Sequence, residues 1–167
     1  IPHHNNKEIL LDCLKSLYQS SYQNFEIIIV DNASTDESIN HVHINYPEVI
    51  IVKSLKNLGY AGGCNLGAKE AKGQYLFFLN NDTIIKSECL NRLIKKLESD
   101  STIVSVQPKI LNLKDKSSFD YAGACGGFLD FLVFPFTRGR IFNKIEKDNG
   151  QYDSPTKIFW ASGAGFL

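Results

Sequence analysis

Two clusters of polar side chains stand where they could bind a ligand. Residues 31–36 read Asp-Asn-Ala-Ser-Thr-Asp and residues 80–83 read Asn-Asn-Asp-Thr, and each cluster directly follows an apolar run. If the runs are parallel strands, both clusters lie at strand carboxyl ends, where open α/β sheets bind ligands. Asn80 and Asp82, spaced i, i+2, can then present two oxygens to one Mg²⁺ or Mn²⁺. Each cluster alone is also typical of a turn or a helix N-cap, so a structural role stays open.

A glycine-rich stretch offers a second kind of chemistry. Residues 57–67 read Asn-Leu-Gly-Tyr-Ala-Gly-Gly-Cys-Asn-Leu-Gly and lead from an expected strand into an expected helix. Glycines at such a point let backbone N–H groups approach an anion. The spacing is not G-x-G-x-x-G and contains no G-K-[ST], which disfavours a dinucleotide fold or a P-loop. Close packing of a strand on a helix is the competing interpretation.

The segments that would position these residues alternate between two patterns. Apolar residues at helical spacing predict helices, and continuous apolar runs predict buried strands. The expected helices are Lys7–Gln19, Ser34–Ile44, Gly62–Lys72 and Ser87–Leu97, and the expected strands are Ile1–Pro2, Phe25–Val30, Val49–Val52, Tyr75–Leu79, Thr102–Val106 and Lys157–Trp160. The alternation predicts an α/β fold with a mostly parallel sheet and right-handed crossovers.

Local signals refine these boundaries. Asn5 or Asn6 can cap the first helix, and Gly73 is placed to end the third. Residues 109–150 have no clean periodicity, which predicts an irregular extension over the open edge of the sheet.

Composition narrows the class of protein. The chain has 167 residues, 43% of them hydrophobic, with 18 Lys+Arg against 18 Asp+Glu. The zero net charge disfavours a strongly electropositive nucleic-acid binder, and the apolar content disfavours disorder. The apolar run Phe128–Phe136 is too short to span a membrane and contains Asp130. Four cysteines without a C-x-x-C pair disfavour a zinc ribbon and are typical of reduced thiols in the cytoplasm. Because the chain starts at Ile1 and has no Met, we expect a fragment.

Five segments, in order, resemble family 2 glycosyltransferases of the GT-A fold, in particular rhamnosyltransferase-like members. They are Pro2–Asn6, Val30–Asp36, Asn57–Asn65, Phe78–Thr83 and Trp160–Ala164, the last similar to the family's Trp-x-x-Gly-Ala segment. The resemblance implies a Rossmann-like parallel sheet flanked by helices. It also implies that residues 1–107 form the nucleotide-sugar-binding half and residues 108–167 an acceptor-side extension of the same domain.

The resemblance also implies roles for individual residues. Those implied for nucleotide binding are Pro2, His4, Asn5, Asp31, Gly59 and Asn65. Asp82, with Asn80, stands at the family's Asp-x-Asp metal motif, and the amide at Asn80 removes one negative charge from that motif. Asn81, Trp160 and Gly163 are expected near the donor or acceptor sugar. His3, His41 and His43 are expected at the surface without a role.

Family 2 enzymes invert the anomeric centre. The resemblance therefore implies transfer of a sugar from a UDP- or dTDP-linked donor to a glycan or lipid-linked acceptor, assisted by Mn²⁺ or Mg²⁺, and no nucleic-acid partner. The general base is expected beyond Leu167, and neither Asp120 nor Asp130 is assigned that role, so we expect the fragment to bind nucleotide but turn over poorly. A cytoplasmic location is expected. Peripheral attachment to the inner face of a membrane would come from segments outside this sequence or from an apolar face such as Phe128–Phe136.

Two interpretations from other classes of protein compete with this one. A haloacid-dehalogenase-type phosphatase is disfavoured because Ala33 stands where that motif needs a second Asp. A non-catalytic, degenerate nucleotide-sugar-binding module of a larger protein remains the alternative, because Asn80 weakens the metal motif. This alternative predicts nucleotide binding that is indifferent to metal.

Overall fold

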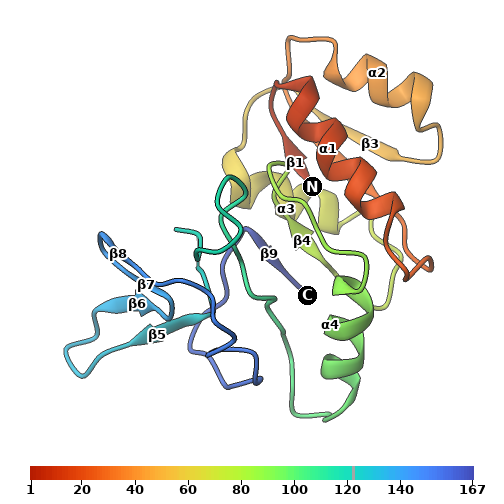
Figure 1. The fold of residues 1–167 in the computed structure, drawn as a ribbon. Helices are drawn as coiled ribbons and strands as arrows, with labels where there is room; N and C mark the ends of the chain where they lie inside the picture. Colours follow the sequence, from red (N-terminus) through yellow and green to blue (C-terminus); the bar gives the residue numbers. More distant parts are fainter. Residues whose placement is uncertain (122) are drawn as a thin grey trace. The chain divides into compact units, whose positions relative to one another are not determined.

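The structure, a computed structural model, describes residues 1–121 and 123–167. These residues form two compact units, Ile1–Arg92 and Leu93–Leu167, whose elements are labelled in Figure 1. The first unit contains β1 (Pro2–His3), α1 (Lys7–Tyr18), β2 (Ile28–Asn32), α2 (Ser38–Asn45), β3 (Ile50–Ser54), α3 (Gly59–Ala68) and β4 (Phe78–Leu79), and α4 (Cys89–Glu98) crosses the boundary. The second contains β5 (Gly127–Leu129), β6 (Pro135–Thr137), β7 (Arg140–Ile141), β8 (Lys144–Ile145) and β9 (Gly165–Phe166). The expected organisation around residue 107 stays a prediction.

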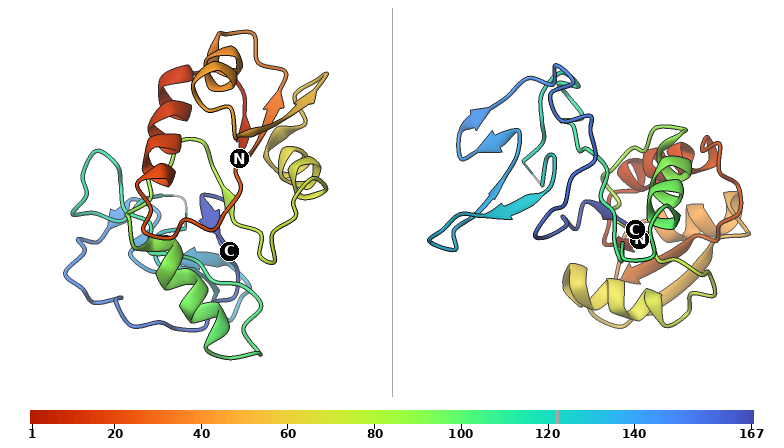
Figure 2. Two further views of the ribbon diagram at one scale, coloured as in Figure 1. Left: turned by 90° about the vertical axis from the view of Figure 1, so that its right-hand side faces the viewer. Right: turned by 90° about the horizontal axis from the view of Figure 1, so that it is seen from below.

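A parallel sheet in the order β1-β2-β3 forms the centre of the first unit. Its register pairs Pro2 with Val30 and Val30 with Val52, so the expected leading strand and the two strands after it are confirmed. The left view of Figure 2 shows α1 and α2 on one side of this sheet and α3 on the other. The predicted α/β architecture with a parallel sheet flanked by helices is therefore present.

The core of the first unit lies mainly under α1. Leu10, Leu14 and Leu17 recur at helical spacing on its buried face and pack with Ile29 of β2 and Val42 of α2. Burying each of these side chains contributes about 1.5–3 kcal/mol relative to exposure. Asn6 caps the helix, its side chain accepting a hydrogen bond from the Ile9 N–H at 3.4 Å. The predicted first helix is thus confirmed to within one residue.

The loop after β2 differs from the prediction. We expected a helix from Ser34, but α2 begins at Ser38 and β2 extends through Asn32. Asp31 Oδ1 accepts from the Ser34 N–H at 2.7 Å, and Ala33 has a left-handed φ of 61°. Residues 33–37 form a loop in which the backbone N–H group of Ser34 is bound by a side chain.

The third helix also has different ends. It runs Gly59–Ala68 instead of Gly62–Lys72, so Gly73 does not cap it. The Glu26 carboxylate accepts hydrogen bonds from the N–H groups of Lys72 (2.6 Å) and Gly73 (3.0 Å). Gly73 therefore belongs to a loop that is fixed to a distant part of the chain.

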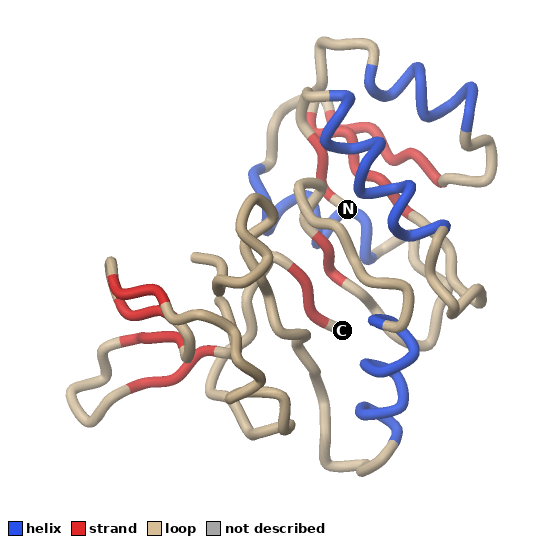
Figure 3. The backbone as a smooth tube through the Cα atoms, in the orientation of Figure 1, coloured by secondary structure: helices blue, strands red, loops and turns tan. Residues whose placement is uncertain are grey.

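The second unit is built on short antiparallel strands. Its four-stranded sheet has the order β5-β6-β7-β8, within the segment that we expected to be irregular. The strand predicted at Thr102–Val106 is absent, and the one at Lys157–Trp160 is reduced to a bridge between Trp160 and Gly127. Figure 3 shows that most of this unit outside α4 is loop, so the expectation of irregular structure was partly right.

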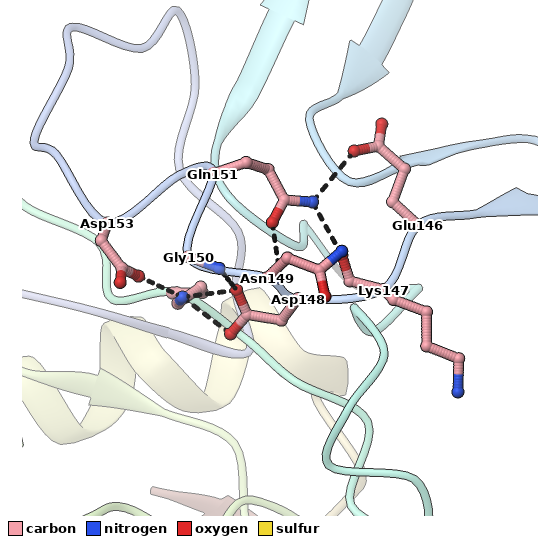
Figure 4. Close-up of polar contacts among 8 residues, drawn as sticks. Glu146, Lys147, Asp148, Asn149, Gly150, Gln151 and Asp153 are labelled. Atoms are coloured by element: carbon pink, nitrogen blue, oxygen red, sulfur yellow. Dashed lines mark hydrogen bonds and ion pairs between the residues drawn. The ribbon is translucent and has the colours of Figure 1, made fainter.

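A cluster of charged and polar side chains organises the loop 146–153 of the second unit (Figure 4). The Lys109 ammonium donates to both carboxylate oxygens of Asp148, at 2.8 and 2.7 Å, and to Asp153. Asp148 Oδ1 also accepts from the Gly150 N–H at 3.1 Å. Burial by itself lowers the pKa of Lys109, but the two carboxylates outweigh that effect and raise it. The charged groups of this cluster are therefore paired with one another and with the backbone of the loop.

Two further expectations concern membranes and thiols. In the part of the chain that the structure describes, no helix is both long and apolar enough to cross a membrane. All four cysteines are free thiols, as the sequence predicted, and Cys13 and Cys125 are buried.

Candidate functional site

A pocket of about 260 Å³ lies within the first unit, where β1 and β2 end and the chain turns after β4. Nine residues line it: Pro2, His3, His4, Asn32, Asn57, Gly59, Tyr60, Asn80 and Asn81. This is the place where an open α/β sheet binds ligands. The two polar clusters of the sequence therefore do meet, through Asn32 and the turn at Asn80.

The loop between β1 and α1 supplies one wall. His4 Nδ1 lies 3.0 Å from the Asn32 carbonyl oxygen, which can only accept, so Nδ1 carries the proton in this contact. Asn5 does not line the pocket. Its side-chain oxygen accepts from the Thr35 N–H at 2.7 Å, and its N–H donates to Ser34 Oγ at 3.1 Å. Asn5 thus holds the loop after β2 against the loop after β1.

Asp31 is buried near the pocket without lining it. Its carboxylate accepts from the Ser34 N–H, which matches the capping role that we left open, although no helix starts there. Its role in binding a nucleotide stays a prediction.

His3 corrects an expectation, because it is only 1% exposed instead of lying at the surface. It sits at the end of β1, and its two ring nitrogens contact groups distant in sequence. Nε2 lies 2.8 Å from Ser38 Oγ, and Nδ1 lies 2.9 Å from Asn81 Nδ2. Burial lowers the pKa of His3, with Asp36 and Asp31 acting in the opposite direction. His41 is half-buried and His43 exposed.

The Asp36 carboxylate determines which groups donate and which accept along this chain of hydrogen bonds. Asp36 can only accept, so the single hydroxyl proton of Ser38 points to it. Ser38 Oγ must then accept from His3 Nε2–H, which leaves Nδ1 of the neutral ring as an acceptor. Asn81 must therefore donate with Nδ2, and Oδ1 is the atom that its amide can offer to a ligand.

The other wall belongs to the glycine-rich stretch. Asn57 Oδ1 accepts from the Gly59 N–H at 2.8 Å, and Asn32 Nδ2 donates to the Gly59 carbonyl at 3.2 Å. Gly59 has a φ of 68°, which glycine adopts without strain. A Cβ on Gly63 would lie 2.8 Å from the Pro2 Cβ, so close packing of α3 on the sheet requires glycine there. Asn65 is exposed on α3 and does not line the pocket.

The turn after β4 carries the expected metal ligands. The Asn80 carbonyl accepts from Thr83 Oγ1 at 2.7 Å, and Asn80 Oδ1 accepts from the Asn81 N–H at 3.0 Å. The Asp82 side chain is exposed. Among the described residues no three His, Cys, Asp or Glu side chains gather to hold a metal by themselves. One carboxylate and one amide fit a divalent cation that takes its other ligands from water and substrate phosphates.

The lining contains neither Lys nor Arg, although it includes two histidines, several amides and the phenol of Tyr60. Burial, followed by Cys64 and Asp82, raises the pKa of Tyr60, so its hydroxyl stays protonated. A diphosphate would therefore need its charge balanced by a cation rather than by the residues of this pocket.

Trp160 and Gly163 lie in the second unit. The Trp160 indole N–H donates to the Phe128 carbonyl at 3.3 Å, and its ring packs so closely on Gly127 that a Cβ there would lie 2.0 Å from it. Gly163 follows Ser162, whose N–H donates to Gln107 Oε1 at 2.6 Å. These contacts give both residues a structural role, and contact with a sugar stays a prediction.

Of the predicted site residues, the structure gathers a subset around the pocket: Pro2, His4, Gly59, Asn80 and Asn81. Four lining residues had no predicted role: His3, Asn32, Asn57 and Tyr60. All four lie inside the segments that carried the family resemblance. The position of Asn32 in the polar cluster at the end of a predicted strand was a usable signal, whereas nothing local distinguished His3.

Comparison with known proteins agrees with this geometry. The sequence profile of glycosyl transferase family 2 matches residues 1–163. The chain is 35% identical over 112 residues to the poly(ribitol-phosphate) beta-glucosyltransferase of Bacillus spizizenii, covering 62% of this chain and 18% of that protein. It is 30% identical over 103 residues to the UDP-Glc:alpha-D-GlcNAc-diphosphoundecaprenol beta-1,3-glucosyltransferase WfaP of Escherichia coli, covering 61% of this chain and 41% of that one.

Among solved structures, the mannosyltransferase PcManGT of Pyrobaculum calidifontis, in complex with GDP-Man and Mn²⁺, superposes with a TM-score of 0.59. Its identity of 22% supports a shared fold, the GT-A fold, and the match covers 69% of this chain and 35% of that one. The chain thus spans well under half the length of each of these three proteins.

Proposed function

Because this chain belongs to glycosyl transferase family 2, we propose that it carries the donor-binding part of an enzyme that transfers a sugar from a nucleotide diphosphate to a hydroxyl group. The observation that carries the proposal is the pocket at the carboxyl ends of β1 and β2, lined by uncharged hydrogen-bonding groups and bordered by the turn at Asn80. Such a lining suits the neutral part of a nucleotide sugar. The wider process is assembly of a polysaccharide or another glycan.

We propose a UDP- or dTDP-linked hexose as the donor. One similar protein is named for UDP-Glc and one solved relative holds GDP-Man, and both are sugar nucleotides. Pro2, His4, Asn5, Asp31, Gly59 and Asn65 are proposed to bind or shape the nucleotide site. Asn81 is proposed to contact the donor sugar, with Trp160 and Gly163 serving the sugar or the acceptor.

The metal in this proposal is Mn²⁺ or Mg²⁺, held by Asp82 with Asn80. When bound, it supplies neutralisation of the negative charge that builds on the leaving diphosphate. Hydrogen bonds to Asn81 and Thr83 fix the conformation of Asn80, so its amide oxygen is preorganised for the cation. Replacing the first carboxylate of the motif by Asn80 is expected to weaken the affinity for the cation.

The proposed reaction is a single displacement with inversion. A bond forms between the acceptor oxygen and the anomeric carbon, while the bond from that carbon to the diphosphate oxygen breaks. The acceptor proton passes to a general base. No residue of this chain is assigned that role: Asp130, for example, accepts from the N–H groups of Leu132 (2.8 Å) and Phe134 (2.9 Å) and shapes a turn.

A lipid-linked acceptor would bring the protein to the cytoplasmic face of a membrane, and we propose peripheral attachment there. Phe131, Leu132, Val133 and Phe134 are all more than half exposed at the tip between β5 and β6. Asp130 binds two of the backbone N–H groups of this tip, which lowers the cost of placing it in an apolar layer. Flotation with anionic vesicles tests the attachment, and equal binding of wild type and Phe131→Ser would contradict it.

Thermal unfolding with a panel of nucleoside diphosphates, each with Mn²⁺ and with chelator, tests the proposed function. A nucleotide at 100 times its Kd stabilises the protein by about 2.7 kcal/mol, a shift of about 5–10 °C at this size. We expect a shift with UDP or dTDP that is larger with Mn²⁺.

A shift that ignores the metal would instead favour the non-catalytic nucleotide-sugar-binding module. No shift with any nucleotide would contradict both functions. Assay of the intact protein for sugar transfer then separates a catalyst from a binding module.

A further inference from the structure

Four side chains of the first unit form a hydrogen-bond network that leads from the surface to the pocket, the His3 network: Asp36, Ser38, His3 and Asn81. Its two inner members are fully buried, with Ser38 0% and His3 1% exposed. Asp36 is exposed at one end, and Asn81 is half-buried in the pocket lining at the other. Buried polar groups are costly unless they are paired, so each donor in this network must meet an acceptor.

The charged end of the network is held in place by three hydrogen bonds. Asp36 Oδ1 accepts from the Ser38 hydroxyl and from the Ser38 N–H at 3.2 Å, and the Asp36 N–H donates to Asn5 Oδ1 at 3.3 Å. Burial acts to raise the pKa of Asp36, but the hydrogen bonds from Ser38 outweigh that effect and lower it. The carboxylate is therefore ionised at neutral pH and can only accept.

This carboxylate determines the tautomer of His3. The single hydroxyl proton of Ser38 points to the carboxylate, so Ser38 Oγ accepts from His3 Nε2–H, 2.8 Å away. Burial lowers the pKa of His3, so the ring is neutral and Nδ1 carries no proton. Nδ1 then accepts from Asn81 Nδ2, 2.9 Å away. A reversed amide would set Asn81 Oδ1 against the bare Nδ1, which places two acceptors in contact.

The contact with His3 decides which end of the Asn81 amide faces the pocket. The two orientations of an asparagine amide have nearly the same shape, so the hydrogen-bond partners select one of them. The backbone of Asn81 is fixed separately, because its N–H donates to Asn80 Oδ1 at 3.0 Å. What His3 adds is therefore the choice between an acceptor and a donor at this wall of the pocket.

We propose that Asp36, Ser38 and His3 are positioning residues that hold one amide with its oxygen, and not its amino group, toward the ligand. That amide belongs to Asn81, which selects a ligand that donates a hydrogen bond at this point. Asp36 and Ser38 do not line the pocket and act through His3. The nature of the ligand rests on the proposed function, in which Asn81 contacts the donor sugar, whose hydroxyl groups can donate to this oxygen.

Nuclear magnetic resonance of the intact protein, isotopically labelled at histidine and asparagine, tests the orientation of the amide. An N–H···N hydrogen bond from Asn81 Nδ2 to His3 Nδ1 gives a scalar coupling between the two nitrogens, whereas the reversed amide gives none. We expect this coupling in wild type, together with a proton on Nε2. Ser38→Ala removes the acceptor of Nε2–H, so the ring should take the Nδ1–H tautomer and the coupling should disappear. Ser38→Thr keeps the hydroxyl and should restore it.

A second variant reaches the network without changing the core. Asp36→Ala, at an exposed position, frees the Ser38 hydroxyl to donate to Nε2 of His3, so the coupling should weaken there as well. Glu37→Ala, at the neighbouring exposed position, is the control and should keep the coupling of wild type.

Calorimetric titration of the intact protein with UDP-glucose and dTDP-glucose in Mn²⁺ measures the effect on the ligand. We expect Ser38→Ala to bind about tenfold more weakly, which corresponds to about 1.4 kcal/mol, and Ser38→Thr to bind as wild type does. Ser20→Ala is the matched control, because Ser20 is 3% exposed, lies outside the pocket lining and donates to the Ser87 carbonyl at 3.3 Å. It should lose stability without losing affinity.

Asn81→Asp separates orientation from folding. A carboxylate presents an oxygen in either orientation, so adding Ser38→Ala to Asn81→Asp should change the affinity by less than about twofold. A tenfold loss in that background would show that Ser38 supports the fold and does not orient the amide.

The proposal is overturned if wild type lacks the coupling, if Ser38→Ala retains it, or if Ser38→Ala binds the nucleotide sugars as tightly as wild type does. The first of these measurements does not depend on the folding of any variant. If wild type shows the coupling but binds neither nucleotide sugar, the proposed function fails, whereas the positioning of the amide is upheld.

Discussion

The two units use polar side chains in opposite ways. In the second unit, Lys109, Asp148 and Asp153 bind one another and the backbone around them (Figure 4). In the first unit, Asn32 donates to Gly59 and Asn81 bonds to His3, but the Asn32 Oδ1 atom has no hydrogen-bond partner among the described residues. In both regions, hydrogen bonds fix the positions of the polar side chains. Among the residues that the structure describes, the one buried side-chain N or O atom without a hydrogen-bond partner lies in the first unit.

This difference gives a criterion for separating a structural cluster from a binding site. If charge density alone marked a binding site, the cluster at Lys109 would be the better candidate, because it holds three charged groups in contact. The pairing of polar atoms points to the pocket as the binding site instead. Buried polar atoms in folded proteins are nearly always hydrogen-bonded, so an unpaired buried oxygen needs an explanation.

Asp82→Ala should have the largest effect. In the proposed function Asp82 is the principal metal ligand, so its loss should remove about 3 kcal/mol of charge stabilisation from the leaving diphosphate, which corresponds to a hundredfold or more in kcat. The metal-dependent part of the nucleotide-induced thermal shift should disappear as well. Asp12→Ala, at an exposed position of α1, is the control, and an unchanged metal dependence in Asp82→Ala would argue against this ligand.

Lys109→Met should lower the free energy of unfolding by about 1–3 kcal/mol without changing nucleotide binding. The substitution leaves Asp148, whose side chain is 15% exposed, without its ammonium partner. Urea unfolding measures the loss, with Lys116→Met at an exposed position as control. A fall in nucleotide affinity at unchanged stability would show that this cluster is more than structural.

Two substitutions of His3 should separate its two hydrogen bonds. The side-chain oxygen of Asn corresponds in position to Nδ1, which faces Asn81, whereas the terminal amide of Gln corresponds to Nε2, which faces Ser38. His3→Gln should therefore raise the donor KM about tenfold, and His3→Asn about threefold or less. Steady-state kinetics at several donor concentrations gives both values.

Thermal stability is the control for this pair. Gln fills more of the space of His3, so stability alone ranks His3→Gln above His3→Asn, the reverse of the order expected for KM. Adding His3→Gln to Asn81→Ala should change the KM by less than about twofold, because both act through one contact. If the effects of the two substitutions on KM add, His3 does not act through Asn81 and its role is limited to stabilising the fold.

The contrast between the units also explains where sequence reasoning succeeded. Periodicity of apolar residues predicted three elements: the helix at Lys7, the strand that leads to Asp31 and the strand at Ile50. A buried helix face or a buried strand requires apolar residues at regular spacing, so it can be recognised from neighbouring residues alone. We predicted the second helix from Ser34, but it begins at Ser38, and the loop before it is tied to a residue thirty positions away, Asn5, which accepts from the Thr35 N–H. The sheet of the second unit was missed because its strands are two or three residues long, too short for a periodic signal.

The site shows the same division. The sequence by itself determined the α/β class, the order of the polar clusters and their position at strand ends, because these depend on residue type and spacing. Only the tertiary structure decided that His3 is buried, that its ring joins Ser38 to Asn81 across 35 and 78 residues of chain, and that Asn32 Oδ1 finds no hydrogen-bond partner among the described residues. The physical reason is that a hydrogen bond is a property of two groups and their distance, and residue spacing does not record which distant partner a polar atom finds.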